Sequence, residues 1–306
     1  MGRNLKYQFK TCIEKNFKEK MDKHSIKKNK QMNKTRIFSF SDRKNLIDFT
    51  ANLSNWMKEN YSEIKLVKDI NSKHIQEFLN EKAKECSQAT LNQYSSKIRK
   101  MSNLINSTYK TNIKYDFKTP KSSSGKQILR DQQMKLENYK RIHEIMRNGS
   151  NGQKAIEIGK NFGLRVSEIT KLQKRDIDLD KKEILVKDAK GGRDRTVHFN
   201  TEEQIKVAIK LYNSVSRDLD RIVAVKENSI NMALNRAMKK LNIKNDYKET
   251  SFHSIRKLYA QEEYDRLRNE GNSIEMACRQ VSEELGHSAE RGLDEKLISR
   301  YIKNIW

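Results

Sequence analysis

The sequence predicts a mainly helical protein of two domains, and three observations support this fold class. The chain of 306 residues contains 1 proline and 11 glycines, the two residue types that interrupt helices most strongly. Apolar side chains recur every three or four positions through much of the chain, which is the spacing of one helix face. The single proline, Pro120, precedes a Ser/Gly-rich stretch at 121–126 that is typical of a linker.

These features divide the chain into four parts. They are a basic arm at 1–39, a helical domain at 40–117, the linker at 118–130 and a second domain at 131–306. Residues 1–36 contain 12 Lys or Arg against 3 acidic residues. The spacing of Phe9, Ile13 and Phe17 favours a short basic helix within the arm. We expect the arm either to lie along phosphates or to be a solvated tail.

The first domain is predicted to be a bundle of about four helices. Ser41 is the expected cap of its first helix. Three apolar stripes at helical spacing indicate its core: Leu46, Phe49, Leu53 and Trp56; Ile75, Phe78 and Leu79; and Leu91, Tyr94, Ile98, Met101 and Ile105. Lys97, Arg99 and Lys100 lie off the last stripe, so they are candidate contacts to phosphate groups.

The second domain is predicted to be α+β, with mostly helices and one β-hairpin. The hairpin is expected at 183–187 and 194–199, joined through Lys190 and two glycines that allow the positive φ of a tight turn. Helices are expected on either side of it, at 132–147, 152–161, 165–173, 202–213, 228–241, 253–269, 273–285 and 294–303.

The charge of the chain indicates a polyanionic partner. The formal net charge is +24, from 64 Lys and Arg against 40 Asp and Glu. This balance favours nucleic acid over a membrane surface, while a solvated helical surface is the alternative. Charge alone does not separate DNA from RNA.

Other sequence features exclude several classes of protein. The 3 cysteines are far apart and form no C-x-x-C pair, so we expect inert thiols in a reducing compartment. The sequence contains no apolar run of about 18 residues, the length needed to cross a membrane. The N-terminus lacks the apolar core of a signal peptide. No H-E-x-x-H or clustered Cys/His spacing predicts a metal site. These features predict a cytoplasmic protein without membrane contact.

A series of short motifs carries the residues suited to chemistry. Arg165 opens a helix within Gly-Leu-Arg-Val-Ser-Glu at 163–168, where the following acid suits a helix N-terminus. The other candidates follow in chain order: Lys190, His253, Arg256, His287 and Tyr301. Breaking a phosphodiester by transesterification needs donors to the non-bridging oxygens, a nucleophile and a proton donor for the leaving oxygen. Arginine suits the first task because its planar fork binds phosphate in a bidentate way.

The ordered set resembles the tyrosine recombinase family of DNA strand-transfer enzymes, over most of residues 40–303. The resemblance implies a helical core-binding domain and a catalytic domain that close on duplex DNA as a C-shaped clamp. It implies that Arg165 and Arg256 hold the phosphate and that His253 is a general base or acid. His287 would donate a hydrogen bond to the scissile phosphate. No cofactor or metal is implied.

Tyr301 is the expected nucleophile, and its attack would leave a 3′ phosphotyrosine that allows rejoining without ATP. The interval between His287 and Tyr301 is longer than family members commonly have. Tyr259 is the alternative nucleophile, because it lies three positions after Arg256 on the same helix face; its other interpretation is packing.

Three basic residues at the expected hairpin, Lys190, Arg193 and Arg195, are candidates for contact with DNA. Lys190 would protonate the leaving 5′ oxygen, as the resemblance implies for a lysine at this place. Arg193 and Arg195 are its neighbours and are expected to contact DNA.

Three functions remain open from the sequence. The first is site-specific recombination or integration of a mobile element. For this function the expected partners are double-stranded DNA, further copies of the chain on that DNA, and accessory proteins of the mobile element. The second is a relaxase that nicks an origin of transfer in plasmid conjugation with the same chemistry. The third is a catalytically inactive DNA-binding accessory protein.

Overall fold

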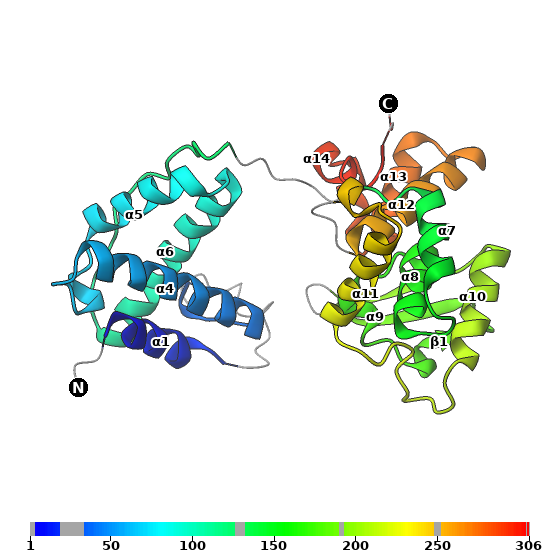
Figure 1. The fold of residues 1–306 in the computed structure, drawn as a ribbon, viewed down its shortest axis with the longest axis horizontal. Helices are drawn as coiled ribbons and strands as arrows, with labels where there is room; N and C mark the ends of the chain where they lie inside the picture. The colour runs from blue at the N-terminus through cyan, green and yellow to red at the C-terminus, as the bar shows by residue number, and fades with distance from the viewer. Residues whose placement is uncertain are drawn as a thin grey trace. The chain divides into compact units, whose positions relative to one another are not determined.

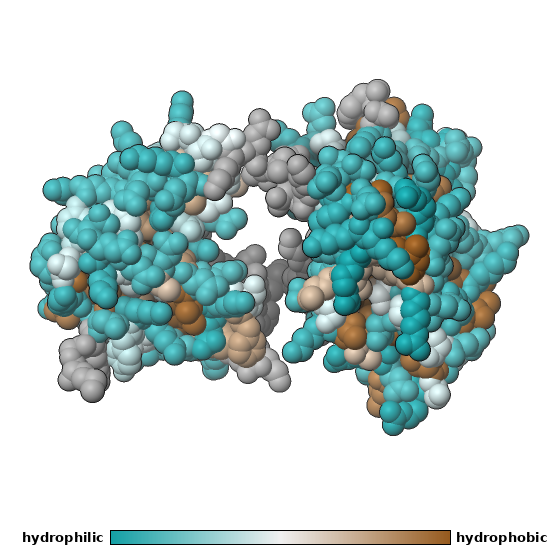
Figure 2. Space-filling model, in the orientation of Figure 1, coloured by the Kyte–Doolittle hydropathy of each residue, from teal (hydrophilic) through white to brown (hydrophobic). Residues whose placement is uncertain are grey.

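The computed structural model describes residues 4–18, 34–125, 132–189, 193–247, 252–303 and 305. The chain forms two compact units, Met1–Ile128 and Leu129–Trp306 (Figure 1). Each unit has its own hydrophobic core and is described by itself. Hydrophilic side chains cover most of the face of each unit that Figure 2 shows, as a charged fraction of 34% leads one to expect.

The N-terminal unit is a helical bundle. Among its described residues, the α-helices are α1 (Leu5–Asn16), α4 (Phe40–Asn60), α5 (Ser72–Glu85) and α6 (Gln88–Tyr109). The apolar residues that sequence spacing placed on α4, α5 and α6 are buried, except Tyr94, which is partly buried against the same core. The cap of α4 is Ser39 and not Ser41, because the Ser39 hydroxyl accepts a hydrogen bond from the Asp42 N–H at 3.1 Å.

Helix α1 belongs to this bundle. The sequence had placed it in a basic arm at 1–39, outside the helical domain expected at 40–117. Phe9 is 1% exposed and Ile13 is fully buried, and both lie in the core of the N-terminal unit. The apolar stripe of α1 must be covered to be stable in water, and the bundle covers it. Asn16 also ties α1 to α6, since its amide donates to the Thr108 hydroxyl at 3.2 Å.

The expected linker at 118–130 is partly attached to the N-terminal unit. The hydroxyls of Ser122 and Ser124 donate to the Cys86 carbonyl at 2.6 and 3.0 Å, and the Ser123 N–H donates to the Ala83 carbonyl at 2.9 Å. Residues 126–131 lie outside the described part of the chain.

The C-terminal unit packs helices against one face of a small sheet, whose other face is exposed at Leu185 and Thr196. In the described part of this unit, three antiparallel strands, β1 (Ile177–Asp178), β2 (Glu183–Ala189) and β3 (Arg193–His198), pair in the order β1-β2-β3. The helices are α7 (Leu136–Ile145), α8 (Asn151–Phe162), α9 (Val166–Ile169), α10 (Glu202–Asn213), α11 (Glu227–Lys240), α12 (His253–Asn269), α13 (Ile274–Glu284) and α14 (Glu295–Ile298). The predicted hairpin is confirmed, and β1 extends it by one strand that sequence reasoning did not include.

Two predicted helices are shorter in the structure. The helix expected at 165–173 is the single turn α9, because the chain then extends and the Leu172 carbonyl accepts from the Ile222 N–H at 3.0 Å. The helix expected at 294–303 is α14, followed by a turn that contains Tyr301. A 3-10 helix, η4 (Ala289–Leu293), occupies the preceding segment. In the described part of the chain, no helix is long and apolar enough to cross a membrane.

Candidate active site

Arg165 lies where α8 ends and α9 begins. Gly163 adopts a left-handed conformation with φ of 60° and ends α8. Two residues later, Arg165 is the N-cap of α9, and the Glu168 carboxylate accepts from its N–H and from its Nη1, both at 2.8 Å. The side chain of Glu168 is 3% exposed. Arg165 is therefore held at a fixed angle by a buried acid one helical turn away.

Arg256 is in the first turn of α12 and is 1% exposed. Its Nη1 donates to the Gly163 carbonyl and its Nη2 to the Leu285 carbonyl. The Leu285 carbonyl also accepts from Arg165 Nη2, at 2.9 Å. Burial, and then the charges of Arg165 and Arg195, lower the pKa of Arg256 to about 9. An anion at this place would relieve the repulsion between the arginines.

Tyr301 lies between the two candidate histidines. His287 Nε2 is 3.3 Å from Tyr301 Oη. The ring centroid of Tyr301 is 5.3 Å from that of His253 and 5.8 Å from that of His287. Burial lowers the pKa of His253 to about 4, and the nearby Arg256 and Lys257 add to this effect. His253 is consequently neutral near pH 7.

The structure brings together five of the six proposed catalytic residues. The shared Leu285 carbonyl joins Arg165 to Arg256, and Tyr301 contacts His287 and packs against the ring of His253. The long interval between His287 and Tyr301, 14 positions, does not prevent their contact, because η4 and α14 fill it. Lys190, the sixth residue, lies outside the described residues.

Tyr259 has a different position from the one an alternative nucleophile needs. It is 3% exposed, and its hydroxyl donates to Glu284 Oε2 at 2.8 Å. Burial and then the Glu284 charge raise its pKa well above the usual value, which opposes formation of a phenolate. Its ring covers Gly163, where an added Cβ would lie 2.4 Å from ring carbons. The packing interpretation of Tyr259 therefore fits this structure better than the nucleophile interpretation.

Arg195 differs from the expected surface contact to DNA. Its side chain is 11% exposed, and its Nη2 donates to Glu168 Oε2 at 2.9 Å. Burial raises the pKa of the Glu168 carboxyl, but Arg195 and the Arg165 N–H outweigh burial and the net pKa is lowered. Sequence reasoning treated Glu168 only as a helix-start acid. The sequence signal for its larger role was its place three positions after Arg165.

The remaining candidates for DNA contact lie on β3 and α6. Arg193 begins β3, and its side chain is outside the described set. On α6, Arg99 is exposed and lies over the Phe117 ring at 5.0 Å. Lys97 lies over the Tyr94 ring at 5.9 Å, and Lys100 pairs with Asp42 at 3.1 Å. All three α6 side chains thus have neighbours within the N-terminal unit.

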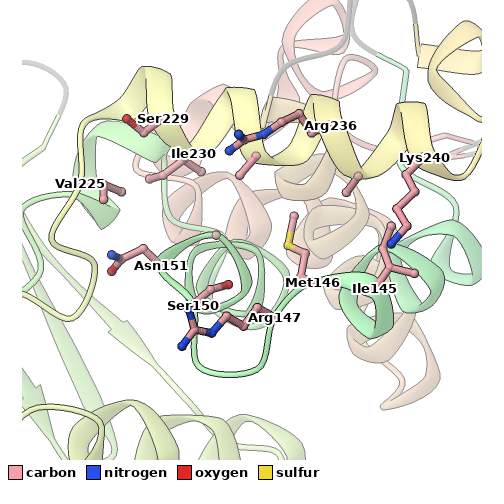
Figure 3. A pocket seen from close by; sticks show the side chains of 13 residues that line it. Ile145, Met146, Arg147, Ser150, Asn151, Val225, Ser229, Ile230, Arg236 and Lys240 are labelled. Atoms are coloured by element: carbon pink, nitrogen blue, oxygen red, sulfur yellow. The ribbon is translucent and has the colours of Figure 1, made fainter.

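The described residues hold no cluster of three or more His, Cys, Asp or Glu side chains suited to a metal ion. A cavity of about 430 Å³ lies between α11 and the segment joining α7 to α8 (Figure 3). Arg147, Arg236 and Lys240 line it together with apolar residues, and none of the proposed catalytic residues does. The candidate site is therefore the arginine, histidine and tyrosine cluster and not this cavity.

Comparison with known proteins identifies relatives of this fold. Residues 132–291 match the model of the phage integrase family. The XerH site-specific recombinase bound to a palindromic difH substrate has a TM-score of 0.61 at 17% identity, over 95% of this chain and 90% of that one. A lambda integrase dimer bound to a COC′ core site has a TM-score of 0.59 at 15% identity, over 92% and 95%. The Tn1549 transposon integrase in complex with a circular intermediate DNA has a TM-score of 0.57 at 15% identity, over 95% and 94%. No curated protein sequence matches the chain.

Proposed function

We propose a function for this chain from the premise that it belongs to the phage integrase family, whose structural relatives here are tyrosine recombinases. The chain cleaves and rejoins DNA strands through a 3′ phosphotyrosine on Tyr301, in site-specific recombination or integration of a mobile element. The observation that carries the proposal is the placement of Tyr301 Oη 3.3 Å from His287 Nε2, beside His253.

The reaction is a transesterification at phosphorus. Tyr301 Oη attacks, the new bond joins it to phosphorus, and the bond from phosphorus to the 5′ oxygen breaks. His253, whose ring packs against that of Tyr301, takes the phenol proton. Lys190 supplies a proton to the departing 5′ oxygen. Attack of a 5′ hydroxyl on the phosphotyrosine reverses the step and rejoins the strand, so no ATP is consumed.

The arginines stabilise the charge that develops on the non-bridging oxygens. Arg165 and Arg256 converge on the Leu285 carbonyl, so their guanidinium groups lie close together before substrate binds. Donors that are already oriented need little rearrangement in the transition state, which is the main source of electrostatic catalysis. His287 adds a donor on the side of Tyr301.

Double-stranded DNA is the proposed partner. The structural relatives XerH and lambda integrase are bound to DNA, and one lambda integrase structure is a tetramer on a Holliday junction. The net charge of +24 supports largely electrostatic binding by this chain. We propose that both units bind the duplex as a clamp. Contacts to DNA phosphates would come from Lys97, Arg99 and Lys100 on α6 and from Arg193 on β3. The protein would act as an oligomer in the cytoplasm.

Two alternatives share this chemistry or this fold. The solved relatives named above are recombinases and integrases, and they give no support to a conjugative relaxase. A catalytically inactive DNA-binding accessory protein would retain the fold without using the site. The presence of both arginines, both histidines and the tyrosine in one cluster favours an active enzyme over this accessory.

Covalent trapping on DNA tests the proposal. Labelled duplexes from the ends of the encoding element, nicked near candidate sites, are incubated without metal or ATP, and the adduct is mapped by peptide analysis. We expect an adduct on Tyr301 that is lost in Tyr301→Phe and falls by about 10²-fold or more in Arg165→Ala and Arg256→Ala. Arg217→Ala, an exposed arginine paired with Asp220, is the control. An adduct on another residue, or no adduct on any of these duplexes, would contradict the proposal.

A further inference from the structure

Arg195 reaches from the sheet into the arginine cluster. It lies on β3, and its side chain is 11% exposed. Its Nη2 donates to Glu168 Oε2 at 2.9 Å and its Nη1 donates to the Glu284 carbonyl at 2.7 Å. One planar fork thus connects β3 to α9 on one side and to the end of α13 on the other.

Glu168 transmits the position of Arg195 to Arg165. Its Oε2 accepts from Arg195 Nη2 at 2.9 Å and from the Arg165 N–H at 2.8 Å, and its Oε1 accepts from Arg165 Nη1 at 2.8 Å. A carboxylate with an exposed fraction of 3% cannot exchange these donors for water. The angle of the Arg165 guanidinium therefore depends on where Arg195 holds the carboxylate.

The main chain at 284–286 gives Arg195 a second route to the site. The Glu284 carbonyl accepts from Arg195, and the next carbonyl, of Leu285, accepts from both Arg165 and Arg256. Gly286 follows with φ of 68°. An added Cβ there would lie 2.8 Å from Arg195 Nε and 3.1 Å from Arg165 Nη1, so the turn packs directly against both side chains.

We propose that Arg195 is a positioning residue for Arg165 and Arg256, which it orients through Glu168 and through the turn at 284–286. The inference rests on the proposed cleavage of DNA, because it concerns the same two arginines. Arg195 does not touch the reacting atoms. Its effect falls on the cleavage step and not on DNA binding, since small displacements of preorganised donors lower the rate while leaving distant contacts unchanged.

The main variant is Arg195→Lys. Lysine keeps a positive charge beside Glu168, so the buried acid retains a cation on each side, but it cannot bridge Glu168 and the Glu284 carbonyl as a fork. Arg195→Gln is the second variant, which removes the charge and leaves Glu168 paired with Arg165. If either variant fails to fold, the other one carries the test.

Lys160→Met is the matched control. Lys160 is in the same unit, its side chain is 10% exposed, and it pairs with Glu203 at 3.2 Å and with Glu262 at 3.4 Å. Its loss also removes a nearly buried cation from two acids, but Lys160 makes no described contact to the arginine cluster. The control separates a general loss of stability from a loss of arginine orientation.

Two substrates distinguish positioning from a merely structural role. The first is the duplex that wild type cleaves, and the second carries a neutral methylphosphonate at the scissile position. On the first, Arg195→Lys should lower the single-turnover rate by about 30-fold with the DNA Kd changed by less than about threefold. On the second, the deficit should shrink to a few-fold, because fewer negative charges require neutralisation by the arginines.

The outcomes are distinct. Wild-type cleavage with the Arg195→Lys deficit on phosphate, its relief on methylphosphonate and a normal rate in Lys160→Met supports the inference. A wild-type rate in both Arg195 variants, an equal deficit on both substrates, or an equal deficit in Lys160→Met overturns it while the proposed function stands. If wild type forms no adduct with any substrate, the proposed function fails, and this inference fails with it.

Discussion

Arg165 and Arg256 donate hydrogen bonds to one acceptor, the main-chain carbonyl of Leu285. They come from different helices and are 91 positions apart, yet this carbonyl fixes both guanidinium groups. His287 lies two residues beyond the acceptor, so the same turn also sets the position of a histidine beside Tyr301. The site thus depends on the exact path of a short backbone segment at the end of α13.

The two candidate tyrosines should respond differently to loss of the hydroxyl. Tyr301→Phe should abolish the covalent DNA adduct and leave DNA binding unchanged. Tyr259→Phe should retain the adduct, because the ring still covers Gly163, but lower the free energy of unfolding by about 1–2 kcal/mol as Glu284 loses a donor. Adduct yield, DNA binding by anisotropy and urea denaturation measure these effects. An adduct that survives Tyr301→Phe and disappears in Tyr259→Phe would reverse the assignment.

His253 should make the fold less stable in acid. Its pKa falls from 6.5 to about 4 on folding, mainly through burial, so below pH 6.5 the unfolded chain binds a proton that the folded chain does not. The free energy of unfolding has its full value above pH 6.5. It decreases as the pH falls towards 4, and His253 accounts for up to about 3 kcal/mol of this decrease. Urea denaturation between pH 4 and pH 8 measures it.

The control for the acid effect is His253→Gln, which cannot bind a proton in this range. We expect its free energy of unfolding to depend less on pH between 6.5 and 4 than that of wild type. Identical pH profiles for the two proteins would show that His253 is not responsible.

A methyl group at Gly163 should displace Tyr259 and, with it, the helix α12 that carries Arg256. Gly163→Ala places a Cβ 2.4 Å from the Tyr259 ring, and its φ of 60° is unfavourable for alanine. We expect a loss of about 2–4 kcal/mol, from backbone strain and from displacement of α12. Gly149→Ala has a similar φ of 67° with nothing within 4 Å, so it should lose only about 1 kcal/mol. Equal losses in the two variants, measured by thermal unfolding, would mean that contact with Tyr259 is unimportant.

Binding to DNA should weaken steeply as salt rises. Each phosphate contact adds about 0.9 to the magnitude of the slope of log K against log salt, so Arg99→Ala should reduce that magnitude by about one. Lys181→Ala, whose side chain is 72% exposed, is a control in the other unit. Anisotropy titrations at several salt concentrations give the slopes. An unchanged slope in Arg99→Ala would remove Arg99 from the proposed DNA contacts.

The sequence predicted the arginine, histidine and tyrosine cluster better than the residues that hold it in place. Arg165, Arg256, His287 and Tyr301 were predicted because their motifs stand in the order of the tyrosine recombinase motifs that the sequence resembles. The roles of Glu168 and Arg195 were not visible, since they depend on contacts across 27 positions between α9 and β3. Local spacing cannot show which surface a side chain meets after folding.

Element boundaries were least accurate where long-range pairing competes with helix formation. The stretch 165–173 has helical spacing, but its end pairs with residues near 221 instead, and α9 stops after one turn. Helix α1 shows the opposite case, because a charge-rich segment looked like an arm although Phe9 and Ile13 pack in a core. At 165–173 tertiary contacts outweighed the helical signal, whereas the helix α1 was predicted and only its burial in the bundle was missed.

The hydrogen-bond acceptors for Arg256 are the main-chain oxygens of Gly163 and Leu285. No codon change at these two positions can delete an acceptor of this kind, because every amino acid retains the same carbonyl. A mutation can therefore remove these two hydrogen bonds only by replacing Arg256 or by changing the path of the backbone. Among natural variants of this chain, inactivating changes should concentrate at the arginines, the histidines, Tyr301 and the tightly packed glycines, while position 285 should keep an apolar residue because its side chain is fully buried.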